Sequence, residues 1–274
     1  MTKRAGVMGW PVSHSMSPRL HGYWLQHYRL DGTYDLLPTE PQNIKAELDR
    51  LAALGYVGIN LTVPHKEIVL PFLAEIDPLA ARVGAVNTVI LNPDGNYIGR
   101  NTDVYGVRRN LESGDYQSDG RAVVLLGAGG AARSGIVALI DMGVTEIYLC
   151  NRTRDKAEQL ATEFGTVIKV FDWGDASVFR GAGLVVNSTS LGMRGQPPLE
   201  ISLDLLPSDA IVSDMVYAPL VTGLLKQAKA RGNHTIDGLG MLLHQAKPAF
   251  HAFFGVEPDV TSELRNHVLA GMKS

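Results

Sequence analysis

Short apolar runs alternate with amphipathic segments along most of the chain, a pattern typical of parallel α/β proteins. In the first part of the chain the apolar runs predict strands at residues 5–9, 33–38, 56–62 and 84–91. The amphipathic segments between them predict helices at residues 17–30, 41–54 and 65–76. Ser17 is expected to cap the first of these helices, because Pro18 follows it and suits a first helical position. Asp94 and Gly95 are expected to form the pivot of a turn that leads into another short strand.

A second unit is predicted from about residue 104 onwards. A helix at residues 104–112 is followed by a polar loop at residues 113–120. Strands that run into helices follow in residues 121–143 and from residue 145, and further strands are predicted at residues 183–190, 210–217 and 234–237. The last predicted elements are amphipathic helices at residues 239–255 and 260–272, and their periodicity does not say on which unit they pack. The predicted fold is therefore α/β with two domains.

Composition narrows the class of protein without identifying it. A chain of 274 residues that is 45% hydrophobic and 19% charged suggests one or two ordinary globular domains. The net charge of −3 gives no electrostatic reason to expect a nucleic-acid partner. No apolar run approaches the roughly 18 residues of a membrane span, and no signal peptide is apparent. The single cysteine, Cys150, suits a reducing compartment, so a cytoplasmic location is expected. The histidines form no spacing typical of a metal site, and no metal is predicted.

A glycine-rich loop provides the first candidate chemistry. The stretch VVLLGAGGAARSG places Gly127, Gly129 and Ala132 in the pattern G-x-G-x-x-A, directly after an apolar strand and at the start of a helix. Backbone N–H groups at such a helix start can bind the phosphates of a dinucleotide. The predicted phosphate loop consists of Gly127, Ala128, Gly129, Gly130, Ala131 and Ala132. The alternative is a glycine-rich corner that binds no ligand.

The next predicted strand bears on the choice of coenzyme. It ends in Asn151, Arg152 and Thr153, with no acidic residue before Asp155. NAD sites usually carry an acid here that binds the ribose 2′-hydroxyl, whereas a guanidinium can bind a 2′-phosphate through two parallel hydrogen bonds. Lys156 adds a further cation. These residues favour NADP(H), and the alternative is that the cations solvate a surface loop.

Lys66 and Asp103 could be ordinary or functional. The stretch NLTVPHKE places Lys66 where an apolar strand gives way to a helix, and a cation in a first helical turn is mildly unfavourable. Lys66 is therefore either a surface lysine or a lysine held at a strand exit for chemistry. Asp103, just before the helix at residues 104–112, is either an N-cap or a functional carboxylate. The residues by themselves leave both choices open.

The chain resembles the shikimate dehydrogenase family in eight segments that occur in the same order: PVSHSMSPRLH, NLTVPHKE, GAVNT, GRNTDVYG, GAGGAAR, NRT, DMVYAP and GLGMLLHQA. The resemblance runs from about residue 6 to about residue 250. It implies an NADPH-dependent, reversible reduction of 3-dehydroshikimate to shikimate, on the route to chorismate and the aromatic amino acids. It also implies that residues 1–103 and 238–274 form a substrate-binding domain with a mixed, mostly parallel sheet. Residues 104–237 would form a Rossmann-like NADP-binding domain, with the active site in the cleft between the domains.

The resemblance further implies roles for individual residues. Lys66 and Asp103 would be the catalytic pair, assisting proton transfer as hydride reaches the C3 carbonyl. Residues implied to bind the substrate are Ser15, Ser17, Thr62, Asn87, Tyr217 and Gln245. Residues implied to bind the cofactor beyond the phosphate loop are Asn151, Arg152, Thr153, Lys156, Thr189, Met215 and Gly238. Asn187 and Ser190 flank Thr189 and are expected to line the same crevice, whereas His65 is assigned no catalytic role.

Other functions remain to be weighed. Lys156 stands where the family often has a second arginine, and lysine brings the charge without the planar fork, so the preference for NADP over NAD is expected to be weaker. The nearest rival is a quinate/shikimate dehydrogenase able to use NAD. A non-catalytic dinucleotide sensor is the rival from another class, and it would be expected to lack the lysine, carboxylate and hydroxyl set that is present here. The expected partner is the small-molecule substrate, with a homodimer as the candidate assembly.

Overall fold

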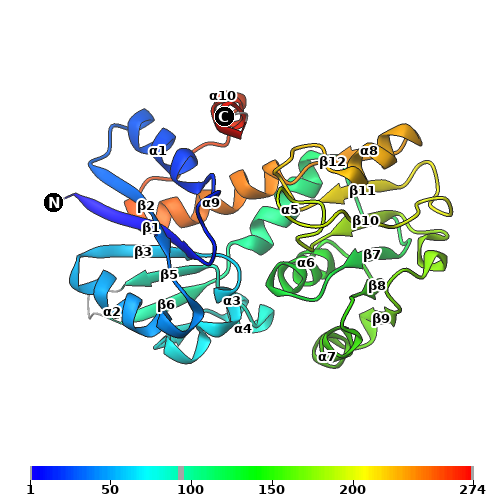
Figure 1. Ribbon diagram of the computed structural model, residues 1–274, viewed down its shortest axis with the longest axis horizontal. Helices are drawn as coiled ribbons and strands as arrows, with labels where there is room; N and C mark the ends of the chain where they lie inside the picture. The colour runs from blue at the N-terminus through cyan, green and yellow to red at the C-terminus, as the bar shows by residue number, and fades with distance from the viewer. Residues whose placement is uncertain (1, 92–95, 273–274) are drawn as a thin grey trace. The chain divides into compact units, whose positions relative to one another are not determined.

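The computed structural model describes residues 2–91 and 96–272, and the chain divides into two compact units (Figure 1). The first unit comprises residues 1–103 and 243–274, and the second comprises residues 104–242. The second boundary falls at Leu242 and Leu243, five residues beyond the position implied by the family resemblance. The predicted turn at Asp94 and Gly95 lies outside the described residues.

The first unit is built on a six-stranded mixed sheet with the order β2-β1-β3-β5-β6-β4. Its strands are β1 (Lys3–Gly9), β2 (Gly32–Pro38), β3 (Tyr56–Leu61), β4 (Glu75–Ile76), β5 (Thr88–Leu91) and β6 (Tyr97–Arg100). Strand β5 pairs antiparallel with β3 and β6, and the other pairs are parallel. The helices and 3₁₀ turns are α1 (Ser17–His27), η1 (Pro41–Asn43), α2 (Ile44–Ala53), α3 (His65–Ile68), η2 (Leu70–Phe72), α4 (Pro78–Val83) and α10 (Ser262–Met272). Helix α9 (Leu239–Phe254) contributes its residues from Leu243 onwards.

Apolar side chains cover both faces of this sheet. On one face, Ile44, Leu48 and Leu51 of α2 pack with Met8 and the rest of a buried cluster from β1, β3 and β5. On the other face, the rings of Trp24, Phe250 and Phe253 from α1 and α9 are buried at 1% exposure or less. Gly58 on β3 is required there, because a Cβ at this position would lie 2.1 Å from the Phe253 ring. The last two helices therefore complete the first unit, a point that periodicity had left open.

Two local predictions for the first unit are wrong. The predicted helix at residues 65–76 ends at Ile68, because Pro71 removes a backbone donor and disfavours helix in the residue before it. Residues 75–76 instead form β4, which pairs with β6. The predicted strand at residues 84–91 begins only at Thr88, because α4 ends on Gly84 with φ 70°.

The predicted Ser17 cap is also wrong. Met16 occupies the N-cap position without a side-chain hydrogen bond, and Ser17 is the first helical residue, with Pro18 next to it. The Ser17 N–H donates to the hydroxyl of Ser15 at 3.3 Å. The hydroxyl of Ser15, and not that of Ser17, therefore accepts a backbone donor at the start of this helix.

The second unit is a doubly wound sheet of six parallel strands. Its strands are β7 (Val123–Leu126), β8 (Ile147–Cys150), β9 (Ile168–Phe171), β10 (Leu184–Asn187), β11 (Ile211–Asp214) and β12 (His234–Ile236). Its helices and 3₁₀ turns are α5 (Asp103–Ser113), α6 (Gly130–Asp141), α7 (Arg154–Phe164), η3 (Gly165–Val167), η4 (Ala176–Phe179) and α8 (Gly223–Ala230). The sheet order β12-β11-β10-β7-β8-β9 is the Rossmann order read from the far edge, so the carboxyl ends of all six strands meet at one edge. The α/β fold with two mixed or parallel sheets confirms the predicted fold class.

Candidate active site

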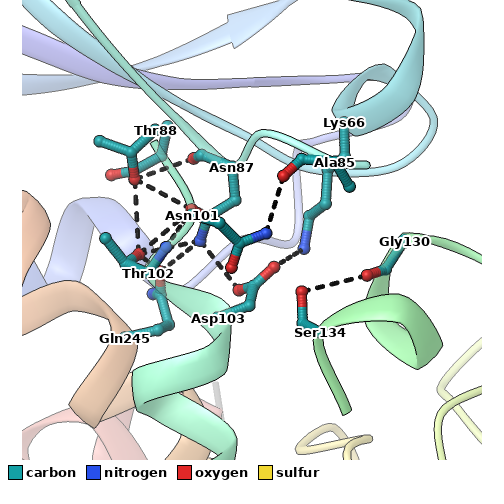
Figure 2. Close-up of polar contacts among 11 residues, drawn as sticks. Lys66, Ala85, Asn87, Thr88, Asn101, Thr102, Asp103, Gly130, Ser134 and Gln245 are labelled. Atoms are coloured by element: carbon teal, nitrogen blue, oxygen red, sulfur yellow. Dashed lines mark hydrogen bonds and ion pairs between the residues drawn. The ribbon is translucent and has the colours of Figure 1, made fainter. Parts of the chain in front are cut away.

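Lys66 and Asp103 form a close ion pair in the first unit (Figure 2). Lys66 lies in the single turn of α3, directly after β3, and its Nζ donates to Oδ2 of Asp103 at 2.6 Å. The Lys66 side chain is 17% exposed and that of Asp103 is 5% exposed, so this lysine is no ordinary surface cation. A charge-assisted hydrogen bond holds this short and largely buried ion pair together. Loss of either side chain would leave the charge of the other one poorly solvated.

The amide of Asn87 orients the carboxylate from the other side. Its Nδ2 lies 2.9 Å from Oδ1 of Asp103 and 2.9 Å from Oγ1 of Thr102. The Thr102 N–H donates to Oδ1 of Asn87 at 2.7 Å. Gln245 from α9 joins this group, with Oε1 3.4 Å from Nδ2 of Asn87 (Figure 2). The structure thus brings together four of the residues predicted for catalysis and substrate binding, Lys66, Asn87, Asp103 and Gln245.

The remaining substrate-binding candidates take different positions. Ser15 and Ser17 are adjacent at the start of α1, and the Ser15 hydroxyl accepts the Ser17 N–H. Thr62 is half-buried just after β3. Its backbone carbonyl accepts a hydrogen bond at 2.8 Å from the N–H of His65, the first residue of α3. Tyr217 belongs to the second unit, whereas the other substrate-binding candidates belong to the first.

His65 has a structural contact. Its side chain is fully buried, and Nε2 donates to the backbone carbonyl of Thr39 at 2.8 Å. Burial lowers the pKa of His65, and the bond to Thr39 opposes that shift. The His65 ring is therefore engaged with the backbone at Thr39.

The glycine loop of the second unit has the geometry of a phosphate cradle. Gly127 adopts φ 109°, and a Cβ there would lie 2.7 Å from Oγ of Ser188, so only glycine fits. Gly129, the N-cap of α6, is exposed and would have no atom within 4 Å of an added Cβ. Helix α6 has no side-chain cap, and the first N–H groups of a helix lack intrahelical acceptors. Open space in front of uncapped N–H groups fits a dinucleotide pyrophosphate.

The cations after β8 differ in how they are engaged. Arg154 is paired with Asp172 at 2.5 Å and with Glu158 at 2.9 Å. Among the residues that the structure describes, no carboxylate is paired with Arg152 or Lys156, and both are exposed. Arg152 therefore keeps its full donor set for an anion such as a 2′-phosphate.

A buried carboxylate orders the loops that follow β10 and β11. Oδ1 of Asp214 accepts from Nδ2 of Asn187 at 2.9 Å and from the N–H of Val216 at 3.0 Å, and Oδ2 accepts from Thr222 at 2.6 Å. Asn187 in turn accepts from the hydroxyl of Thr189 at 2.8 Å. Burial raises the pKa of Asp214, and its three donors oppose that rise. Asp214 was not predicted as a site residue, although its position at the carboxyl end of a parallel strand could have suggested it.

Met215 and Gly238 lie together beyond this network. A Cβ on Gly238 would lie 2.4 Å from the backbone oxygen of Met215, so glycine permits this close backbone approach. The Met215 methyl reaches α6, where it would lie 3.2 Å from a Cβ on Gly135. The cofactor candidates Thr189, Met215 and Gly238 therefore belong to the same unit as the phosphate loop, as does the Asn187 side chain that holds Thr189.

Two family models match this chain, one within each unit. Residues 7–89 match the model of the shikimate dehydrogenase substrate binding domain, and residues 110–191 match the model of shikimate / quinate 5-dehydrogenase. The shikimate dehydrogenase (NADP(+)) of Paramagnetospirillum magneticum is 49% identical over 269 residues, covering 97% of this chain and 98% of the relative. The chain belongs to the shikimate dehydrogenase family.

Two solved structures that are similar to this chain contain different ligands. A shikimate 5-dehydrogenase from Thermus thermophilus, in complex with NADP(H) and shikimate, has a TM-score of 0.88 at 35% identity, covering 98% of this chain and 99% of that chain. A quinate dehydrogenase from Corynebacterium glutamicum, in complex with NAD, has a TM-score of 0.90 at 34% identity, with coverage of 98% and 99%. Shikimate dehydrogenase relatives thus share this fold with a quinate enzyme.

Metal-binding clusters and membrane-spanning helices are both absent from the part of the chain that the structure describes. Within residues 2–91 and 96–272, no group of three or more histidine, cysteine, aspartate or glutamate side chains could hold a metal ion. No helix in these same ranges has the length and apolar character needed to cross a membrane.

Proposed function

We propose that this protein catalyses the NADPH-dependent, reversible reduction of 3-dehydroshikimate to shikimate. The observation that carries the proposal is the Lys66–Asp103 pair, at 2.6 Å and largely shielded from water, in the unit that matches a shikimate dehydrogenase substrate-binding domain. The homologue names support NADP as the coenzyme. The enzyme is thus an oxidoreductase acting on a CH–OH group.

Lys66 and Asp103 are proposed to assist the proton transfer that accompanies hydride transfer. NADPH, when bound, supplies the hydride that reduces the carbonyl. The Lys66 ammonium polarises the C3 carbonyl oxygen and provides the proton that the resulting alkoxide requires. Asp103 holds that ammonium in place and accepts a hydrogen bond from the neighbouring substrate hydroxyl. Because Asn87 fixes the other carboxylate oxygen, the pair is oriented before substrate arrives.

The hydroxyls at the start of α1 are proposed to bind the substrate carboxylate. Ser15 and Ser17 offer donors without a further buried cation, while Thr62, Tyr217 and Gln245 bind ring hydroxyls or the carboxylate. A polyhydroxylated ring is recognised by many such groups, and each is left unpaired when the matching substrate group is missing.

The NADP(H)-binding domain is proposed to span residues 104–237, within the second unit. The phosphate loop and the uncapped start of α6 would bind the pyrophosphate. Arg152, assisted by Asn151, Thr153 and Lys156, would bind the 2′-phosphate. Thr189, Met215 and Gly238 would lie against the nicotinamide.

A quinate dehydrogenase able to use NAD is the second candidate function. It is favoured by the quinate dehydrogenase relative in complex with NAD and by Lys156 in place of a second arginine. Steady-state kcat/KM values with shikimate or quinate and with NADP⁺ or NAD⁺ separate the two. We expect the shikimate–NADP⁺ pair to exceed the other three pairings, and a higher value for quinate would replace the first proposal. A non-catalytic sensor would give no turnover with any pairing.

The assembly and location complete the proposal. A homodimer is the candidate assembly, to be measured by light scattering on the purified protein. A cytoplasmic location is favoured by the single, buried cysteine, Cys150. Fractionation of the source cells tests it.

A further inference from the structure

Two buried polar side chains of the first unit, Tyr34 on β2 and Asn60 on β3, have no part in the site described above. Tyr34 is 8% exposed and Asn60 is 6% exposed. The Tyr34 hydroxyl lies 2.7 Å from Oδ1 of Asn60, and Nδ2 of Asn60 lies 3.0 Å from Oγ1 of Thr88. Oγ1 of Thr88 lies 3.1 Å from Oδ1 of Asn87 (Figure 2). These contacts form a continuous chain from Tyr34 to the amide that orients Asp103.

The direction of the chain is fixed at its Asp103 end. A carboxylate only accepts hydrogen bonds, so Asn87 must turn its NH₂ group toward Oδ1 of Asp103. The backbone N–H of Thr102 only donates, and it lies 2.7 Å from Oδ1 of Asn87. Two independent neighbours therefore set the same orientation of the Asn87 amide.

The direction then carries back through Thr88 and Asn60. Oδ1 of Asn87 only accepts, so the Thr88 hydroxyl donates to it and must accept from Nδ2 of Asn60. Nδ2 of Asn60 also lies 3.2 Å from the backbone carbonyl of Asn87, which again requires an amide donor. Oδ1 of Asn60 consequently faces Tyr34, and the Tyr34 hydroxyl must donate.

Tyr34 stands at the head of the chain. Burial raises the pKa of Tyr34 well above its ordinary value, so the phenol keeps its proton and donates it to Asn60. Every bond from Tyr34 to Asp103 then points toward the carboxylate, and such one-way chains in a buried interior reinforce one another.

We propose that Tyr34 and Asn60 are positioning residues that hold Asn87 and Asp103 in their reactive orientation. The inference rests on the proposed function. Removal of the Tyr34 hydroxyl takes away the donor to Oδ1 of Asn60 and so loosens the chain that ends at Asp103.

The test separates kcat from KM. Tyr34→Phe is expected to lower kcat for shikimate oxidation about tenfold, with KM for shikimate little changed, because the orientation of Asp103 is lost while the groups proposed to bind the substrate remain. Thr88→Val, which cuts the chain on the other side of Asn60, is expected to lower kcat by a similar factor. Because both act on one chain, the double variant should also lose only about tenfold, whereas independent effects would multiply to about 100-fold.

A matched control and a binding measurement complete the design. Tyr56 is a second buried tyrosine of the same sheet, and its hydroxyl donates to Asp35 at 2.5 Å, away from the chain. Tyr56→Phe should keep kcat within about twofold of wild type. Calorimetric titration with shikimate in the absence of cofactor should give Tyr34→Phe a Kd close to that of the wild type and Ser17→Ala a higher one.

The possible results separate a failure of the proposed function from a failure of the inference. An inactive wild-type protein would refute the proposed function, and the inference would fall with it. With an active wild type, the inference is overturned by single variants at the wild-type rate, by a double variant that loses about 100-fold, or by a raised Kd for Tyr34→Phe. A loss in Tyr56→Phe equal to that of Tyr34→Phe would also overturn it. If circular dichroism shows that Tyr34→Phe does not fold, the Asn60→Leu variant, which removes both amide contacts of the chain, replaces it in the cycle under the same criteria.

Discussion

The fully buried His21 is expected to make the folded protein less stable as the pH falls. Its ring stacks on Tyr34 at a centroid distance of 3.9 Å and packs near Trp24 and Phe250. Neither ring nitrogen has a hydrogen-bond partner among the described residues. Because burial disfavours the charged ring, it lowers the pKa of His21 from 6.5 to about 3. The folded protein therefore keeps this histidine neutral under conditions where the unfolded chain protonates it.

The size of the effect follows from proton linkage. Below the unfolded pKa of 6.5 the unfolded state binds one more proton than the folded state, so stability falls as the pH drops toward about 3. The loss amounts to about 1.4 kcal/mol for each pH unit within that window. Between pH 7 and pH 5 the contribution of His21 is therefore about 2 kcal/mol, since titration of the unfolded histidine begins only near its own pKa.

The perturbation is His21→Leu, which removes the titrating group and leaves an apolar side chain of similar size. Urea unfolding, followed by tryptophan fluorescence at pH 7 and pH 5, gives the free energy of unfolding of each protein. The variant should lose about 2 kcal/mol less than the wild type between the two pH values. The other histidines, such as His65, make the same contribution to the pH dependence of stability in both proteins. Their contributions therefore cancel in this difference.

A matched control lies on the same helix. His27 is exposed on α1, and His27→Leu should show the pH dependence of the wild type. The reasoning would be refuted if His21→Leu lost as much stability as the wild type between pH 7 and pH 5, or if the two variants behaved alike.

Three further predictions concern the two sites. Lys66→Met should lower kcat about 100-fold or more with KM for shikimate little changed, because a proton donor acts mainly in the transition state; a kcat near wild type would remove Lys66 from the mechanism. Arg152→Ala should raise KM for NADPH about tenfold or more with little effect on KM for NADH. Arg154→Ala, which breaks existing ion pairs, should change neither KM. Equal effects of the two substitutions would contradict the assignment of Arg152 to the 2′-phosphate. Gly127→Ala should weaken NADPH binding about tenfold or more in a fluorescence titration, because its φ of 109° and the nearby Ser188 hydroxyl exclude a Cβ, and wild-type affinity would argue against the phosphate cradle.

Local patterns predicted the second unit well because a parallel sheet repeats one simple unit. The glycine loop after β7 and the apolar strands β10 and β11 are visible in the sequence, since each buried strand is a short apolar run between turn signals. The edge strand β9 was not predicted. Its segment, IKVF, alternates a lysine with apolar residues, and its strand character depends on pairing with β8.

The first unit was harder because tertiary contacts override local preference there. The apolar periodicity of residues 65–76 favours a helix, yet Pro71 and the pairing of Glu75–Ile76 with β6 divide it. Lys66 could be recognised only through the family resemblance, because Asp103 is 37 residues away in the sequence. Tyr34 and Asn60 looked like ordinary strand residues, since a hydrogen-bond chain across three strands depends on the register between them.

The most direct test of the proposed chemistry follows NADPH absorbance while purified protein is offered 3-dehydroshikimate, with the product separated by chromatography. We expect NADPH to be consumed in proportion to the shikimate formed, and Lys66→Met to consume it at a rate at least about 100-fold lower. Contradiction would come from a wild-type protein that binds NADPH and yet forms no shikimate, or from a Lys66→Met variant that forms it at the wild-type rate.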